Sequence, residues 1–150
     1  MTANAIPAKV TRIPTKLIGL GTPGKMYGCE HLGAVSIERR AKLIGGARAV
    51  LVPTLYNEPF GSVIAEAQLC GTPVITTDYG SFPELVQNGV NGYRCNMLRE
   101  FIQATENVKR LDRASIRANA IAKHSLDAIR PQYQAYFERL STLWAKGWYA

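Results

Sequence analysis

The sequence predicts an α/β fold: a Rossmann-like, three-layer α/β/α domain with a mainly parallel sheet. Five short apolar runs alternate with stretches of helical periodicity, which is the pattern of successive βαβ units. These runs are apolar on both faces, as expected of parallel strands that helices cover on both sides. At 150 residues the chain is long enough for one such domain and too short for two.

The elements are expected in the following order. Residues 1–13 show no periodicity and are expected to form an irregular lead-in, which leaves 14–150 for the domain. The expected strands are 16–20 (KLIGL), 30–35 (EHLGAV), 49–52 (AVLV), 73–76 (PVIT) and 92–95 (GYRC). The expected helices are 36–46, 60–70, 82–87, 97–110, 113–125 and 130–145.

The C-terminal part of the chain, 97–147, is predicted to be a helical tail. Its last helix carries an apolar stripe at helical spacing, with Pro131 near its start: Ile129, Tyr133, Tyr136, Phe137, Leu140, Leu143 and Trp144. Such a stripe packs either on the domain's own core or on a second domain. In the second case, a chain without that domain would expose the stripe and self-associate through this helix.

Composition indicates a globular protein, because 47% of the residues are hydrophobic and 19% are charged. The three cysteines form no C-x-x-C pair, which suits reduced thiols in the cytosol. No apolar run approaches the length of a membrane span, and Pro7, Arg12 and Pro14 interrupt any signal-peptide core. We therefore expect a cytoplasmic protein, either free or peripheral to the membrane.

The net charge of +7 is distributed unevenly. Residues 1–50 carry eight Lys/Arg and two acidic residues, 51–98 carry one and four, and 99–150 carry nine and five. The positive charge lies mainly on predicted helices, without the basic and aromatic strands of an RNA-recognition module. We therefore expect no nucleic-acid partner. An anionic small ligand or an acidic partner surface explains the charge as well.

The loops that follow the predicted strands hold the unusual residues: GTPGK, SIE, PTLYNEPFG and TDYGSFPE. Ligands of open parallel sheets bind beyond the carboxyl ends of the strands. These four loops are expected to open on that one edge. The sequence therefore predicts a binding site there.

The segment NEPFGSVIAE is the most informative of these loops. Pro59 suits the first position of a helix, and Gly61 allows the backbone to approach a ligand closely. The amides of Phe60, Gly61, Ser62 and Val63 would then form a helix N-terminus, which attracts anions. The sequence predicts an anion site at this helix start.

A helical wheel places the two glutamates of this segment differently. It buries one face (Phe60, Val63, Ile64, Ala67 and Cys70) and puts Ala65 and Gln68 outside. Glu66 falls at the border between the faces, which favours a ligand contact. Glu58 precedes the helix, where it either interacts with the helix dipole or binds a ligand.

The series EPFGSVIAE, CGTPV and PELVQNGVNG, in this order and spacing, closely resembles the C-terminal domain of family 4 retaining glycosyltransferases. These are GT-B enzymes that use nucleotide-sugar donors. The resemblance is strong over 32–93 and looser to about 145. It implies that Glu58, the candidate catalytic residue, binds hydroxyls of the donor sugar. The amides of 60–63 would bind sugar hydroxyls and the diphosphate.

The resemblance implies further roles. Glu66 would accept hydrogen bonds from the ribose, and the backbone from Gly33 to Val35 would face the base. UDP-, GDP- and ADP-sugars all remain possible donors. No cofactor and no metal are expected, and His31 and His124 are expected to be ordinary structural or surface residues.

The chain also departs from the family pattern. The family domain opens with a strand and a G-R-x-x-x-K-G loop, whereas GLGTPGK has Leu20 at the position of that arginine. Residues 16–20 instead resemble the second family strand, so the first strand is lacking; Lys25 could replace the lost cation on the other alignment. In the family order 3-2-1-4-5-6 the lacking strand is central. We expect 16–20 to move into that place, or another chain to fill it.

These observations predict the donor-binding half of a retaining glycosyltransferase that transfers a hexose-type sugar, truncated or split and inactive alone. The sugar, lipid or protein acceptor would bind through an N-terminal domain that has no counterpart in these residues. One alternative is a non-catalytic module that binds nucleotides or nucleotide-sugars. The other is a fragment of a GT-B epimerase or phosphorylase.

Overall fold

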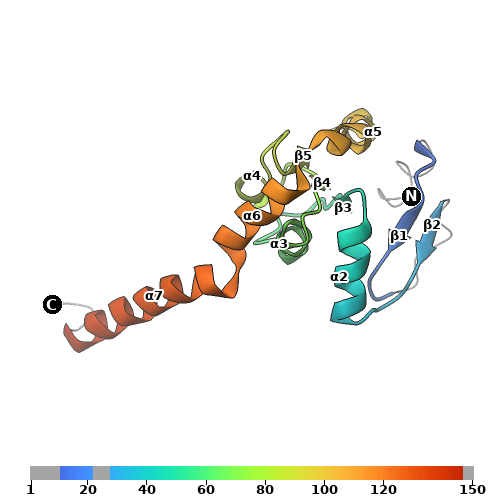
Figure 1. Ribbon diagram of the computed structural model, residues 1–150. Coiled ribbons are helices and arrows are strands. Elements are labelled where there is room, and N and C mark those ends of the chain that lie inside the picture. Colours follow the sequence, from blue (N-terminus) through green and yellow to red (C-terminus); the bar gives the residue numbers. More distant parts are fainter. Residues whose placement is uncertain (1–10, 22–27, 147–150) are drawn as a thin grey trace.

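The computed structural model describes residues 11–21 and 28–146 and has the predicted α/β architecture (Figure 1). Each strand overlaps the run predicted for it. The strands are β1 (Thr15–Leu17), β2 (Cys29–His31), β3 (Val50–Val52), β4 (Val74–Thr76) and β5 (Gly92–Arg94). All pairings between neighbouring strands are parallel. The prediction of a mainly parallel sheet arrangement is confirmed.

The helices also follow the predicted order. They are α2 (Ile37–Gly46), α3 (Ser62–Leu69), α4 (Phe82–Leu85), α5 (Leu98–Asn107), the 3-10 turn η1 (Val108–Arg110), α6 (Arg113–His124) and α7 (Leu126–Lys146). Helix α7 begins four residues before the predicted start, because the Ser125 hydroxyl accepts a hydrogen bond from the Ala128 amide and caps it. Pro131 therefore lies inside α7 and not at its start. None of the helices in the described ranges is both long and apolar enough to cross a membrane.

The strands form two separate sheets, one of β1 and β2 and the other in the order β3-β4-β5. The expectation that 16–20 would occupy the central place of one continuous sheet is wrong. Strand β1 pairs with β2, and hydrogen bonds from Leu32 N to Leu17 O and from Gly19 N to Gly33 O continue that ladder beyond the strands. This extended ladder holds β1 beside β2. Among the described residues, no strand joins the two-stranded sheet to the three-stranded sheet.

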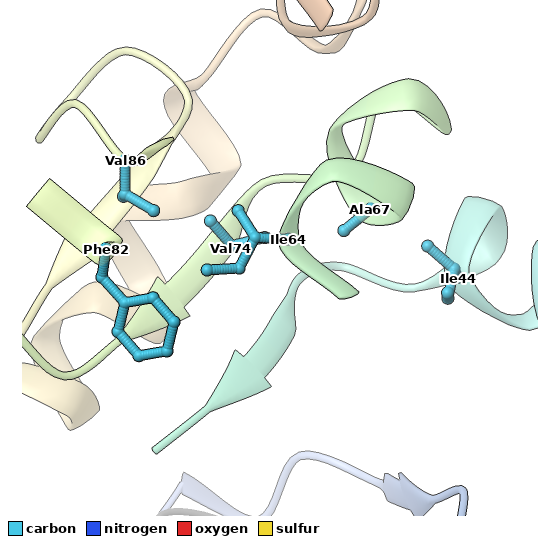
Figure 2. Packing of buried hydrophobic residues seen from close by; sticks show 6 residues of the cluster. All are labelled: Ile44, Ile64, Ala67, Val74, Phe82 and Val86. Carbon is cyan, nitrogen blue, oxygen red and sulfur yellow. The ribbon is translucent and has the colours of Figure 1, made fainter. Parts of the chain in front are cut away.

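Hydrophobic cores cover both faces of the three-stranded sheet. On one face Val74 of β4 packs against residues from α2, α3, α4 and the end of α4: Ile44, Ile64, Ala67, Phe82 and the C-cap residue Val86 (Figure 2). On the other face Ile75 of β4 packs against Cys95, Phe101, Ala104 and Val108. Neighbouring residues of β4 thus point to opposite layers, as the pleat requires. The predicted three-layer arrangement is confirmed for this sheet.

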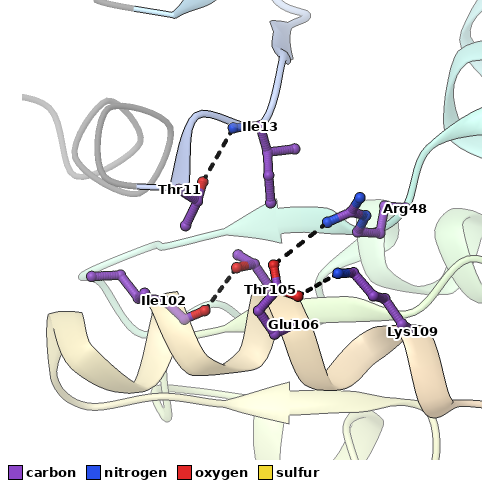
Figure 3. Close-up of polar contacts among 7 residues, drawn as sticks. All are labelled: Thr11, Ile13, Arg48, Ile102, Thr105, Glu106 and Lys109. Atoms are coloured by element: carbon purple, nitrogen blue, oxygen red, sulfur yellow. Dashed lines mark hydrogen bonds and ion pairs between the residues drawn. The ribbon is translucent and has the colours of Figure 1, made fainter.

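Polar contacts hold α5 beside the chain that enters β3 (Figure 3). Arg48, which precedes β3, lies 3.8 Å from Glu106 of α5, and Lys109 forms a second ion pair with the same carboxylate. The hydrogen bond from Lys109 is the main cause that lowers the pKa of Glu106. The Thr105 hydroxyl donates to Ile102 O at 2.7 Å. Of these contacts, the Arg48–Glu106 pair joins α5 to the chain before β3, while the other two lie within the segment of α5 and η1.

Candidate functional site

The loops after β3 and β4 lie together at the carboxyl edge of the sheet, as predicted. Ser81 N donates to Glu58 O at 2.8 Å, and the Thr77 hydroxyl donates to Thr54 O. The contact is so close that a Cβ on Gly80 would lie 2.3 Å from Glu58 N. Glycine is therefore required at position 80 by the neighbouring backbone. The loop after β4 supports the one that carries Glu58.

Helix α3 begins at Ser62, so the prediction that Pro59 opens this helix is wrong. Gly61 precedes the helix as its N-cap in the left-handed conformation, with φ 81°. A Cβ at this position would lie 3.3 Å from side-chain atoms of Ile64 and Phe82. The chain can therefore turn sharply into α3 only with glycine here, and the first amides of α3 have no acceptor inside the helix. The predicted anion site begins two residues later than expected.

Glu58 lies at this helix start and is held by two partners. Its Oε1 accepts a hydrogen bond from Gly61 N at 3.1 Å, and its Oε2 accepts one from the Tyr56 hydroxyl. The hydrogen bond to Glu58 is the main cause that raises the pKa of Tyr56. The interaction of Glu58 with the helix end is therefore present, and its role in binding a ligand stays a prediction. The contribution of Tyr56 was missed in the sequence, although it lies only two residues away.

The buried face of helix α3 is rotated relative to the face that the helical wheel predicted. Phe60 and Val63 are about half exposed, whereas Ala65 and Gln68, placed outside by the wheel, are buried. The reason is that α6 and the end of α4 cover that side, and the Gln68 amide donates to Leu85 O at 2.9 Å. The exposed Phe60 lies edge-on to the His124 ring at 6.4 Å. Phe60 and Val63 therefore border the open site and not the core.

Glu66 is half exposed at the border of α3, as predicted, and is paired with Arg40 of α2. Arg40 Nη2 lies 3.0 Å from Glu66 Oε1, and both side chains remain about 40% exposed. Exposed ion pairs of this kind contribute about 0–1 kcal/mol, so a ligand can displace the arginine at low cost. Arg40 was not identified in the sequence. The only sequence signal was its position two residues after the segment SIE.

The loop after β2 leads directly to this ion pair. Gly33 has φ 66°, and both Gly33 and Val35 are partly buried. The Ser36 hydroxyl then accepts a hydrogen bond from Arg39 N and caps α2, which places Arg40 in its first turns. The backbone at 33–35 is thus close in sequence to the partner of Glu66. Lys25 lies outside the described residues.

Two buried hydroxyls on the same edge have no hydrogen-bond partner in the described part of the chain, Thr76 Oγ1 and Ser81 Oγ. Thr76 ends β4, and Ser81 follows the glycine that contacts Glu58. Buried hydroxyls normally have a partner, so each of these two groups retains the capacity for a hydrogen bond that the described residues do not use. Among the described residues, no three His, Cys, Asp or Glu side chains gather as metal ligands. The site therefore offers helix amides, two carboxylates and hydroxyls, which suit a ligand that is both anionic and rich in hydroxyl groups.

Comparison with known proteins relates these residues to a family. The family model described as "Glycosyl transferases group 1" matches residues 27–117. A D-inositol 3-phosphate glycosyltransferase of Actinosynnema mirum is 39% identical in an alignment 84 residues long, which covers 49% of this chain and 20% of that protein. An uncharacterized glycosyltransferase of Methanocaldococcus jannaschii is 41% identical over 69 residues, 46% of this chain and 17% of that protein. The matched part spans about a fifth of the length of these curated relatives.

Solved structures show the same fold. AviGT4, a glycosyltransferase involved in Avilamycin A biosynthesis, superposes with a TM-score of 0.73 at 24% identity over 92% of this chain and 46% of that chain. Anabaena Alr3699/HepE, solved in complex with UDP-glucose, superposes with a TM-score of 0.72 at 24% identity over 93% of this chain and 45% of that chain. At this identity the likeness establishes the fold, a Rossmann-like half of the GT-B architecture. The predicted fold class is confirmed.

Proposed function

Because the chain belongs to the glycosyl transferases group 1 family, we propose that it is the donor-binding half of a retaining glycosyltransferase that uses a nucleotide-linked hexose. One observation carries this proposal: Glu58 and Glu66 stand on either side of the start of α3, on the open edge of the sheet. The diphosphate would meet the free amides of the helix start, and the two carboxylates would accept hydrogen bonds from sugar and ribose hydroxyls.

The two carboxylates would bind different parts of the donor. Glu66 is displaced along α3 toward α2, so it would bind the ribose, with the backbone at 33–35 facing the base. Glu58 lies at the loop before α3, next to the unpartnered hydroxyl of Ser81, so it would bind the transferred sugar. In this arrangement Arg40 leaves Glu66 when the ribose arrives.

This half is expected to contribute to the reaction by positioning the donor and by stabilising the charge on the leaving diphosphate. Transfer requires donor and acceptor to be oriented together, and the leaving diphosphate must be stabilised as negative charge develops on it. The amides at the start of α3 would supply part of that stabilisation. The acceptor would bind to residues beyond these 150 or to another chain. We therefore expect the chain alone to bind donors weakly and to transfer no sugar, with no need for a metal ion.

A thermal-shift panel of UDP-, GDP- and ADP-glucose tests the proposal. A donor at several times its dissociation constant should stabilise the fold by about 1 kcal/mol, which for a chain of this length raises the Tm by about 2–4 °C. The proposal requires such a shift for at least one donor. The variant Arg40→Met serves as a comparison. It removes the side chain that competes with the ribose for Glu66, so it should bind that donor at least as tightly as the parent does. No shift with any donor would contradict the proposal.

A second candidate, a non-catalytic nucleotide-sugar-binding module, is favoured by Leu20. This side chain is 93% exposed where the resemblance leads one to expect the arginine that binds the diphosphate. A module of this kind would bind the donor in the same way and would activate or complement another chain. Adding a separately produced acceptor domain distinguishes the two, because only the split enzyme then transfers sugar.

A further inference from the structure

Tyr56 contacts the Glu58 carboxylate although its own side chain stands largely in solvent. The side chain is 62% exposed and belongs to the loop between β3 and α3, on the carboxyl edge of the sheet. Its hydroxyl donates a hydrogen bond to Glu58 Oε2, two residues further along the chain. An exposed ring adds little to the core, so the hydrogen bond to Glu58 is the main contact that the structure gives this side chain.

The backbone on both sides of Tyr56 is fixed by the loop after β4. The Thr77 hydroxyl donates to Thr54 O, and Ser81 N donates to Glu58 O at 2.8 Å. These two hydrogen bonds hold the chain two residues before Tyr56 and two residues after it. The backbone positions of Tyr56 and Glu58 are therefore set by the fold, and only rotations about side-chain bonds decide whether the two side chains meet.

Two donors hold the Glu58 carboxylate, one on each oxygen. Gly61 N donates to Oε1 at 3.1 Å, and the Tyr56 hydroxyl donates to Oε2. Because both oxygens are bonded, the carboxylate cannot rotate freely about its last bond. Each carboxylate oxygen can still accept a second hydrogen bond. The two donors therefore orient Glu58 and leave both of its oxygens able to accept a hydroxyl group of a ligand.

We propose that Tyr56 is a positioning residue, whose hydroxyl holds the Glu58 carboxylate in the orientation that binds the transferred sugar of the donor. This role rests on the proposed function. A glutamate side chain that is free in solution loses conformational entropy when a ligand orders it, and that loss weakens binding. Tyr56 orders Glu58 when the chain folds, before the donor arrives. It acts through Glu58 and is not itself expected to touch the donor.

Arg40, the partner of the other glutamate, is expected to act in the opposite direction. Its guanidinium lies 3.0 Å from Glu66 Oε1 and compensates the charge of that carboxylate, so it must leave when the ribose binds. The Tyr56 hydroxyl is neutral, so Glu58 keeps its full charge as an acceptor. Removing the Arg40 side chain should therefore leave donor binding unchanged or tighter, whereas removing the Tyr56 hydroxyl should weaken it.

Calorimetry on Tyr56→Phe tests the proposal, because this variant loses only an exposed hydroxyl. UDP-, GDP- and ADP-glucose and the three free nucleotides are each titrated into the parent and the variant. Ordering one flexible side chain on binding changes an affinity about three- to tenfold. Tyr56→Phe should therefore bind the nucleotide-sugar about three- to tenfold more weakly than the parent, and the free nucleotide equally well.

Tyr79→Phe is the matched control for this experiment. Tyr79 is 46% exposed in the loop after β4, and its hydroxyl has no hydrogen-bond partner among the described residues. The variant should bind every ligand like the parent. Thermal unfolding checks that both phenylalanine variants are folded.

The double variant Tyr56→Phe/Glu58→Ala separates positioning from a general effect on the loop. If Tyr56 acts only through the carboxylate, the double variant should bind the nucleotide-sugar as tightly as Glu58→Ala alone, because the two effects are then not additive. A loosened loop would instead add to the effect of Glu58→Ala and would also weaken the free nucleotide.

A pH titration of chains labelled with 13C at the tyrosine Cζ tests the contact without any donor. The hydrogen bond to Glu58 is the main cause that raises the pKa of Tyr56. Its signal, identified by its loss in Tyr56→Phe, should therefore titrate above the ordinary tyrosine pKa of about 10 in the parent and at lower pH in Glu58→Ala.

The outcomes distinguish this role from the proposed function. A parent that binds none of the six ligands contradicts the proposed function and the role of Tyr56 with it. If the parent binds a nucleotide-sugar and Tyr56→Phe binds it equally or more tightly, the proposed function stands and the positioning role is wrong. A Tyr56 signal that Glu58→Ala leaves unchanged would show that the two side chains are not in contact, which also overturns the positioning role.

Discussion

Replacing Gly80 by alanine should loosen the loop that carries Glu58. Gly80 has φ 60°, and a Cβ there would lie 2.3 Å from Glu58 N, 2.4 Å from Glu58 O and 2.9 Å from Asn57 C. All three are backbone atoms, so no side-chain rotation can relieve the contact. The chain must separate the two loops, which breaks the 2.8 Å hydrogen bond from Ser81 N to Glu58 O.

The loss of stability expected for Gly80→Ala is the sum of two costs. An alanine in the left-handed region costs about 1–2 kcal/mol, and forcing an extra methyl group into packed backbone costs about 1–3 kcal/mol more. Gly89 provides a matched control, because it has φ 76° but nothing within 4 Å of its Cβ position. Gly89→Ala should therefore show the conformational cost alone. The difference between the two variants should be about 1–3 kcal/mol, or roughly 3–10 °C in Tm for a chain of this length.

Thermal and urea unfolding followed by circular dichroism measure this difference. Donor binding by the folded fraction of Gly80→Ala should also fall, because Glu58 is displaced, while Gly89→Ala should bind like the parent. Equal stability of the two alanine variants would refute the reasoning, since it would mean that Gly80 and Glu58 are not in contact.

Three further predictions concern stability and reactivity. Arg113 donates to Gly45 O, Ala47 O and the Thr72 hydroxyl at 2.6–2.8 Å, so Arg113→Met should lower the free energy of unfolding by about 1–2 kcal/mol in urea titrations, and Arg110→Met should change it little. Burial raises the pKa of Cys95 to about 12, so a thiol reagent should modify Cys95 only after denaturant is added; modification at the native rate of an exposed thiol would contradict this. Burial, followed by the charge of Lys123, lowers the pKa of His124. The unfolded chain therefore gains more protons, and stability should fall as pH drops from about 6.5 through the lower folded pKa, but less so in His124→Gln.

The parts of the fold that the sequence predicts well are those set by local pattern. The runs around β3, β4 and β5 are apolar on both faces, and the structure places helices on both sides of them. The E-x7-E spacing likewise brings Glu58 and Glu66 to one edge, because one lies just before α3 and the other in its second turn. These features depend on residues that are near one another in the chain.

The sequence-based predictions fail where contacts between residues far apart in the chain determine the local structure. The angles of a helical wheel put Gln68 outside, but Leu85 O accepts its hydrogen bond and α6 packs against α3. Helix α3 begins after Gly61 and not at Pro59: Gly61 adopts a left-handed conformation, and a Cβ there would be in tight contact with Phe82 from a later helix. Whether β1 joins the sheet of β3 depends on which strand pairs with β1, and the local sequence pattern does not specify that pairing. Arg40 was missed for the same reason, since its partner is 26 residues away.

The central claim, that the two glutamates divide the donor between them, is tested most directly by calorimetry. The nucleotide and nucleotide-sugar that give the largest thermal shift are titrated into Glu66→Gln, Glu58→Gln and the off-site control Glu30→Gln. A hydrogen bond to a charged group contributes about 1.5–3 kcal/mol, so Glu66→Gln should weaken both ligands by about tenfold or more. Glu58→Gln should weaken the nucleotide-sugar and leave the free nucleotide unchanged, and Glu30→Gln should bind both like the parent. If Glu66→Gln binds both ligands as tightly as the parent, the assignment of Glu66 to the ribose is wrong, and its role is limited to the ion pair with Arg40.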